Sequence, residues 1–96
     1  MVEEVLDLNK ISRICKAYNV AKVGLFGSLA RGDYGPASDV DLLVEFSEPL
    51  SLLQLVALER QLAEVLKRKV DLVTRKALSP YLAQRIEQEL RTIYEA

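Results

Sequence analysis

Two short motifs in this 96-residue chain hold residue types that can bind a nucleoside triphosphate. In Gly27-Ser28, a glycine allows the backbone to approach a phosphate closely, and a serine hydroxyl can donate to a phosphate oxygen. In Asp39-Val40-Asp41, two carboxylates alternate along an apolar segment. Side chains two apart on a strand point to the same face, so Asp39 and Asp41 can converge on a cation. The two motifs together predict a site for a metal-bound nucleoside triphosphate.

Asp71 is a candidate for a third carboxylate of the same site. It lies in an expected strand at residues 69–74 and would join Asp39 and Asp41 if this strand lies beside the one that they start. Three carboxylates around two metal ions, about 3.5 to 4 Å apart, are typical of nucleotidyl transfer. The chain has no histidine, so we expect carboxylates to do the acid–base chemistry and any metal to be a hard, oxygen-preferring ion.

Each of these features also has a purely structural interpretation. A Gly-Ser pair after a strand is usually only a turn, and an Asp-x-Asp pair usually lies on a solvated strand face. Asp71 can be an exposed strand-end residue or pair with Lys69, while Arg31 can either add charge near a phosphate or pair with Asp33. The apolar residues 42–44 favour the functional interpretation, because ionised pairs on a buried strand are costly without a cation.

The elements expected to position these residues alternate between helix and strand. Periodicity and capping signals predict helices after Asp7, at 28–31, after Ser51 and after Ser79-Pro80. Short apolar runs predict strands at 23–26, 40–46, 69–74 and 92–95. This order indicates an α/β fold, a small mixed sheet of three to four strands flanked by helices, in a single domain over residues 1–96.

The expected helix after Ser51 is apolar over more than one stripe. A core stripe is expected from Leu55, Leu58, Leu62, Val65 and Leu66, and further apolar residues widen the face at Leu50, Leu52, Leu53, Val56 and Ala57. The wide face indicates either a surface for a partner or a helix that is buried on several sides, and the sequence favours neither.

Composition limits the classes of partner and the compartment. Thirteen basic and 14 acidic residues give a net charge of −1, so we expect no stable nucleic-acid binding by this chain alone. No apolar run is long enough to span a membrane, and residues 1–4 lack the features of a signal peptide. A single cysteine, Cys15, falls on an apolar helix face and is expected to be buried. These features predict a cytoplasmic protein.

The motifs taken together resemble the minimal nucleotidyltransferase family of the DNA polymerase β-like superfamily. The resemblance covers nearly the whole chain and is carried by Gly27-Ser28, Ala30-Arg31-Gly32-Asp33, residues 38–44 and residues 69–73. It implies that two Mg²⁺ ions bind to Asp39, Asp41 and Asp71, with Asp71 also acting as the general base. It further implies that the nucleotide is held by Gly27, Ser28, Arg31 and Ser38.

The resemblance also implies a partner, because such proteins are often encoded beside a helical HEPN-family toxin. Transfer of AMP from ATP to a tyrosine of that toxin would silence its ribonuclease activity. The two proteins would form a hetero-oligomer, and a homodimer is possible when this chain is isolated. We expect no second domain that grips the nucleobase, so another subunit would present base and acceptor. Two alternatives stay open: an antitoxin that acts by binding alone, and a nucleotidyltransferase for RNA or a small molecule such as an aminoglycoside.

Overall fold

The computed structural model describes residues 6–96, so residues 1–4, which bear on the signal-peptide expectation, lie outside the described residues. Its elements follow the expected alternation of helix and strand. They are α2 (Leu8–Ala17), β1 (Val20–Phe26), α3 (Ser28–Arg31), β2 (Val40–Phe46), α4 (Leu52–Leu66), β3 (Val70–Thr74), the 3₁₀ turn η1 (Arg75–Ala77), α5 (Pro80–Glu89) and β4 (Arg91–Glu95). No helix within residues 6–96 is long and apolar enough to cross a membrane.

The four strands form one mixed sheet in the order β3-β2-β1-β4. β1 pairs antiparallel with both β2 and β4, whereas β2 and β3 are parallel and are joined through α4. The expected mixed sheet is therefore confirmed with four strands. The adjacency of β2 and β3, on which the role of Asp71 depends, is confirmed as well.

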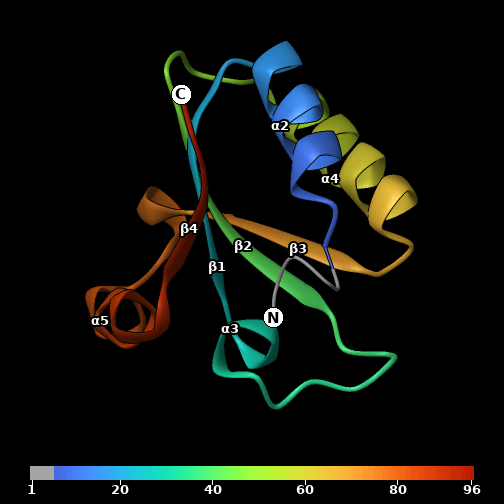
Figure 1. The fold of residues 1–96 in the computed structure, drawn as a ribbon. Helices are drawn as coiled ribbons and strands as arrows, with labels where there is room; N and C mark the ends of the chain where they lie inside the picture. Colours follow the sequence, from blue (N-terminus) through green and yellow to red (C-terminus); the bar gives the residue numbers. More distant parts are fainter. Residues whose placement is uncertain (1–5) are drawn as a thin grey trace.

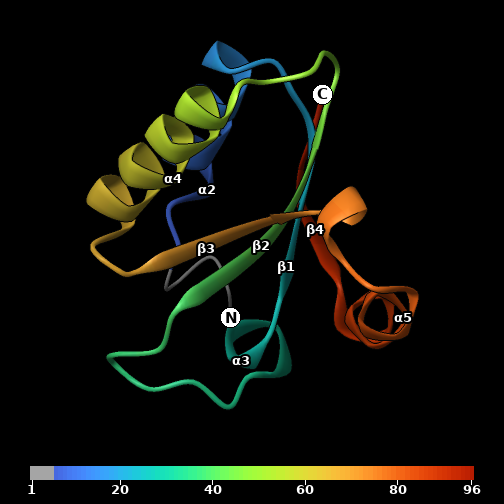
Figure 2. The same ribbon diagram turned by 180° about the vertical axis from the view of Figure 1, so that it is seen from behind.

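Helices cover the two faces of this sheet unequally. α2 and α4 pack side by side on one face, α5 lies on the other, and α3 stands at the end where β1 finishes (Figure 1, Figure 2). The main core fills the space between the sheet and the α2–α4 pair; its fully buried side chains include Ile11, Cys15, Val23, Leu25, Leu42, Val44, Leu58 and Leu62. The face that carries α5 is more open.

Side-chain caps start the three long helices where the sequence predicts them. The carboxylate of Asp7 accepts the N–H of Lys10 at 3.1 Å, and the hydroxyl of Ser79 accepts the N–H of Leu82 at 3.2 Å. Ser51 and Gln54 form a reciprocal capping box, with bonds of 3.2 and 3.0 Å. Each cap satisfies a backbone N–H that the first helical turn leaves without a partner.

Helix α4 is buried along one stripe only. Leu58, Leu62 and Leu66 lie in the core, whereas Leu52 is 75% exposed, Leu53 82% and Val56 45%. A helix buried on several sides is therefore the wrong alternative for the start of α4. The alternative of a partner surface stays a prediction for the exposed apolar patch of Leu52, Leu53 and Val56.

Candidate active site

The turn at Gly27-Ser28 lies between the end of β1 and the start of α3. Gly27 has a φ of 79°, in the region that favours glycine. A Cβ atom added at this position would collide with the carboxylate of Asp41. Two features therefore require glycine at this position: its backbone conformation and the close approach of the turn to β2.

The three predicted carboxylates come from the neighbouring strands β2 and β3. Asp41 stands directly opposite Asp71 in the parallel register, and Asp39 precedes the start of β2 by one residue. Side chains alternate along a strand, so Asp41 lies on the sheet face opposite to that of Leu42, which packs into the main core. The carboxylates therefore belong to the more open, α5-covered face of the sheet. No ion pair joins Asp71 to Lys69, but Asp71 is exposed near the start of β3, so its interpretation as an exposed strand-end carboxylate agrees with the structure as well.

One cavity of about 710 Å³ collects most of the predicted site residues. Its lining includes Gly27, Ser28, Arg31, Asp39, Asp41 and Asp71. Ser38 is not part of the lining, and its hydroxyl instead accepts the N–H of Gly35 at 2.8 Å. The structure thus brings six of the seven predicted residues to one space and leaves Ser38 in the loop that precedes β2.

The cavity wall formed by β2 and β3 is electrostatically suited to a cation. The pKa of Asp41 is raised, first by burial of its carboxylate and then by the negative charges of Asp71 and Asp39. Such mutual repulsion is relieved when a cation binds between the carboxylates. Within residues 6–96, no three acidic or cysteine side chains already stand in a metal-holding arrangement. A bound ion would therefore require these side chains to rotate toward it.

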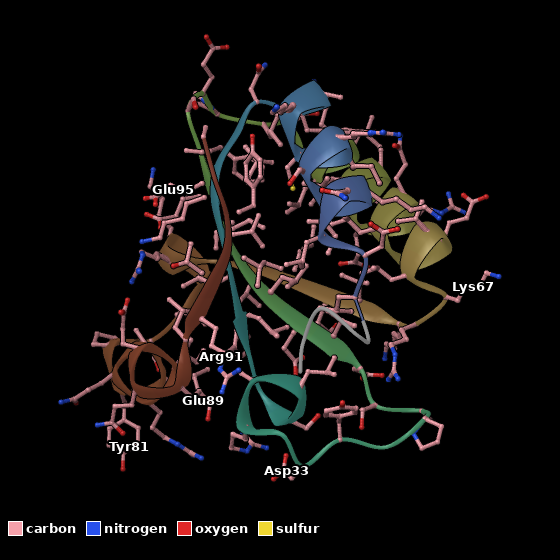
Figure 3. The ribbon with its side chains drawn as sticks, viewed as in Figure 1. Asp33, Lys67, Tyr81, Glu89, Arg91 and Glu95 are labelled. Atoms are coloured by element: carbon pink, nitrogen blue, oxygen red, sulfur yellow. The ribbon has the colours of Figure 1, made fainter. Side chains whose placement is uncertain are left out.

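Glu89, at the end of α5, lies beside α3, which follows the Gly27-Ser28 turn (Figure 3). Its carboxylate accepts hydrogen bonds from the N–H of Gly27 at 2.9 Å and from the guanidinium of Arg31 at 3.1 Å. Arg31 also pairs with Asp33 at 3.4 Å, as the sequence allowed. The sequence analysis missed Glu89, which lies 62 residues from Gly27. The sequence does place Glu89 at helical spacing from Leu82 and Ile86, and this spacing could have predicted that it lies on the inner face of α5.

Helix α5 supplies a whole wall of the cavity that the sequence analysis did not assign to the site. Leu82, Arg85, Ile86 and Glu89 all line the cavity. Their spacing of three, four and seven residues places them on one helical face. The site therefore combines an acidic wall from the sheet with a mixed apolar and charged wall from α5.

Comparison with known proteins places this geometry in a family. The family model described as "Nucleotidyltransferase domain" matches residues 8–93. A protein of Methanocaldococcus jannaschii, named provisionally as a protein adenylyltransferase, is 38% identical over 93% of this chain and 91% of its own length. Protein adenylyltransferase MntA of Thermococcus cleftensis is 36% identical over 93% of this chain and 89% of its own.

A solved structure shows the same fold. It is a crystal structure of a toxin–antitoxin with AMP-PNP, in which one chain superposes with a TM-score of 0.81 and 27% identity. The superposition covers 95% of the present chain and 75% of that chain. The fold expected from the sequence is therefore confirmed.

Proposed function

The chain belongs to the nucleotidyltransferase domain family, and from this premise we propose that it transfers AMP from ATP to a tyrosine of a HEPN-type toxin and so acts as its antitoxin. The name of the Thermococcus relative, a protein adenylyltransferase, supports a protein as the acceptor. The solved toxin–antitoxin with AMP-PNP supports ATP as the donor and a toxin as the partner. The expected tyrosine acceptor and the HEPN class of toxin rest on the family resemblance of the sequence.

One observation carries this proposal more than any other. Asp41 and Asp71 face each other across the β2–β3 register, in the same cavity as the Gly27-Ser28 turn. Carboxylates and a phosphate-sized turn on one cavity are the groups that nucleotidyl transfer needs. A solvated acidic strand face would not require the turn to approach Asp41 so closely.

The transfer step places distinct demands on the lining residues. The phenolic oxygen of the acceptor forms a bond to the α-phosphorus of ATP, and the bond from that phosphorus to the β-phosphate bridging oxygen breaks, releasing pyrophosphate. Gly27 and Ser28 bind phosphate oxygens and orient the triphosphate of ATP. Asp71 takes the phenolic proton, the general-base role that the resemblance implies. Holding donor and acceptor in line contributes much of the rate enhancement.

The donor set fits Mg²⁺, the metal that the family implies. Asp39, Asp41 and Asp71 offer only oxygen ligands, which this ion prefers, and binding it would relieve the repulsion that raises the pKa of Asp41. When bound, such an ion supplies Lewis-acid stabilisation of the charge on the transferring phosphoryl group. Mg²⁺ is thus our proposal for the metal of this site.

The test is to incubate the chain with the product of the gene adjacent to its own, expected to be the toxin, together with labelled ATP and Mg²⁺. We expect label on the toxin with the native chain and none with Asp39→Asn plus Asp41→Asn. A matched control, Glu48→Gln plus Glu64→Gln, removes the same charge from exposed positions outside the cavity and should label normally. Absence of label with the native chain, or equal label with the aspartate variant, contradicts the proposal.

The exposed apolar patch on α4 favours a second candidate, an antitoxin that neutralises its partner by binding alone. An apolar patch of this kind suits contact with a protein surface. This candidate predicts that Asp39→Asn plus Asp41→Asn still protects cells from the toxin. Loss of protection by that variant, with complex formation intact, rules it out in favour of AMP transfer.

A further inference from the structure

The cavity contains a cation that neither the sequence motifs nor the family match assigns to any role. We propose that Arg85 of α5 binds the phosphate tail of the nucleotide in the same cavity as the Gly27-Ser28 turn. The proposal rests on the proposed nucleotidyl-transfer function and adds a phosphate-binding residue to it.

The position of Arg85 follows from the geometry of α5. It lines the cavity together with Ile86, the buried residue of this helix, and with Glu89 one turn further on. Glu89 reaches the N–H of Gly27 at 2.9 Å, so this face of α5 lies next to the turn. Arg85 therefore projects from the same face as a residue that already touches the predicted phosphate site.

The charges around the cavity single out Arg85. Among the described residues, the lining contains two cations, Arg31 and Arg85. Glu89 binds the Arg31 guanidinium at 3.1 Å, and Asp33 binds it at 3.4 Å, so its charge is already compensated. Arg85 forms no ion pair with the acidic residues that the structure describes.

An arginine that lines the cavity without an ion-pair partner among residues 6–96 is suited to binding a polyanion. A triphosphate entering this cavity meets the acidic groups of Asp39, Asp41 and Asp71 and needs positive charge beyond what a metal supplies. A guanidinium donates two parallel hydrogen bonds to phosphate oxygens, which makes arginine the preferred side chain for this contact. Arg85 can provide both the charge and the donors from the chain itself.

The experiment measures binding of ATP, AMP and adenosine to the full chain by calorimetry in the presence of Mg²⁺. Arg85→Gln removes the charge and keeps a polar side chain. It should weaken ATP binding about 10-fold, since a hydrogen bond to a charged group is worth that much, and should leave adenosine binding unchanged. Arg85→Lys should recover part of the loss. Arg60→Gln, on an exposed site of α4 outside the cavity, is the charge-matched control.

The outcomes separate this proposal from the proposed function. If the native chain binds ATP and Arg85→Gln binds it equally well, Arg85 has no role in phosphate binding. An equal loss for ATP and adenosine assigns Arg85 to the nucleoside and also overturns the proposal. If the native chain binds none of the three ligands, the failure lies with the proposed nucleotide site. Thermal unfolding of each variant shows whether a loss comes from misfolding.

Discussion

The carboxylate of Asp41 occupies the space that a side chain at Gly27 would need. The Gly27-Ser28 turn therefore packs closely against Asp41 of β2. This packing also means that the turn and the carboxylate cannot be varied independently.

Gly27→Ala should therefore damage the site more than backbone strain alone explains. Gly27 has a φ of 79° and a ψ of −157°, a backbone region almost restricted to glycine, where another residue costs about 1 to 3 kcal/mol, and here the new Cβ also displaces Asp41. Gly32→Ala is a matched control, because Gly32 has a φ of 85° and open space around its Cβ position. Gly32 has the left-handed α conformation, with a ψ of 4°, so Gly32→Ala should cost less free energy of unfolding than Gly27→Ala. We expect a loss of ATP binding only in Gly27→Ala. Equal ATP binding by both variants would contradict the contact.

Asp41→Asn should stabilise the metal-free chain at neutral pH. The pKa of Asp41 is raised above its ordinary 3.8, so the folded state holds the proton more tightly than the unfolded chain does. Ionisation of Asp41 therefore lowers stability as the pH rises above 3.8, so the penalty is larger at pH 7 than in acid. Solvent screening keeps the gain on substitution below about 1 kcal/mol.

Thermal unfolding with and without Mg²⁺ checks this prediction. The melting temperature of Asp41→Asn should exceed that of the native chain at pH 7 in EDTA, and the difference should vanish below pH 3.8. Added Mg²⁺ should raise the melting temperature of the native chain and have little effect on the variant. A variant that is less stable at pH 7 in EDTA would show that Asp41 makes a favourable contact in the metal-free state.

Glu89→Ala should lower the free energy of unfolding by about 1 to 3 kcal/mol, because it leaves the half-buried N–H of Gly27 without its acceptor. Glu89→Gln keeps an acceptor for that N–H and should cost less. Glu87→Ala, two residues away, breaks an exposed pair with Arg75 and should change stability by less than about 1 kcal/mol. Urea unfolding measures all three, and equal effects of Glu89→Ala and Glu87→Ala would show that the Gly27 bond contributes little.

Alkaline pH should destabilise the fold through Cys15. Burial raises the pKa of this thiol from 9.0 to about 11, so the folded state keeps a proton that the unfolded chain loses earlier. Stability then falls as the pH rises from 9.0 toward 11, by about 1 to 3 kcal/mol in total. Cys15→Ala should show a shallower decline over the same range, although its cavity lowers stability at every pH. Parallel urea titrations of both proteins test the difference in slope.

The exposed patch on α4 should contribute to binding and not to folding. Leu53 is 82% exposed, so Leu53→Ser should change the free energy of unfolding by less than about 0.5 kcal/mol. Leu58, fully buried on the same helix, is the contrast, and Leu58→Ala should cost about 2 to 5 kcal/mol. If the patch contacts the toxin, Leu53→Ser weakens the complex in a pull-down with the purified partner while the chain remains folded.

The sequence predicts those parts of the site that depend on local pattern. Asp39 and Asp41 follow from strand alternation, and Gly27-Ser28 from the junction of a strand with a helix. The contribution of Asp71 required β3 to lie beside β2, which the resemblance suggested and the sheet order confirms. Glu89 and Arg85 escaped prediction because charged residues on an amphipathic helix ordinarily face solvent. Only the packing of α5 against the open sheet face, set by contacts distant in sequence, turns them toward the cavity.

The parallel pairing of β2 with β3 also determines at which stage of folding the site can form, because Asp41 and Asp71 meet only when these strands pair. Its acidic wall requires the crossover through α4 to close, and its opposite wall requires α5 to dock near the chain's last strand. A nascent or partly folded chain, even with the β1–β2 hairpin formed, holds Asp41 without Asp71 or Glu89. The proposed nucleotide site thus needs all of these elements in place at once, so we expect nucleotide binding to report on folding of the whole domain.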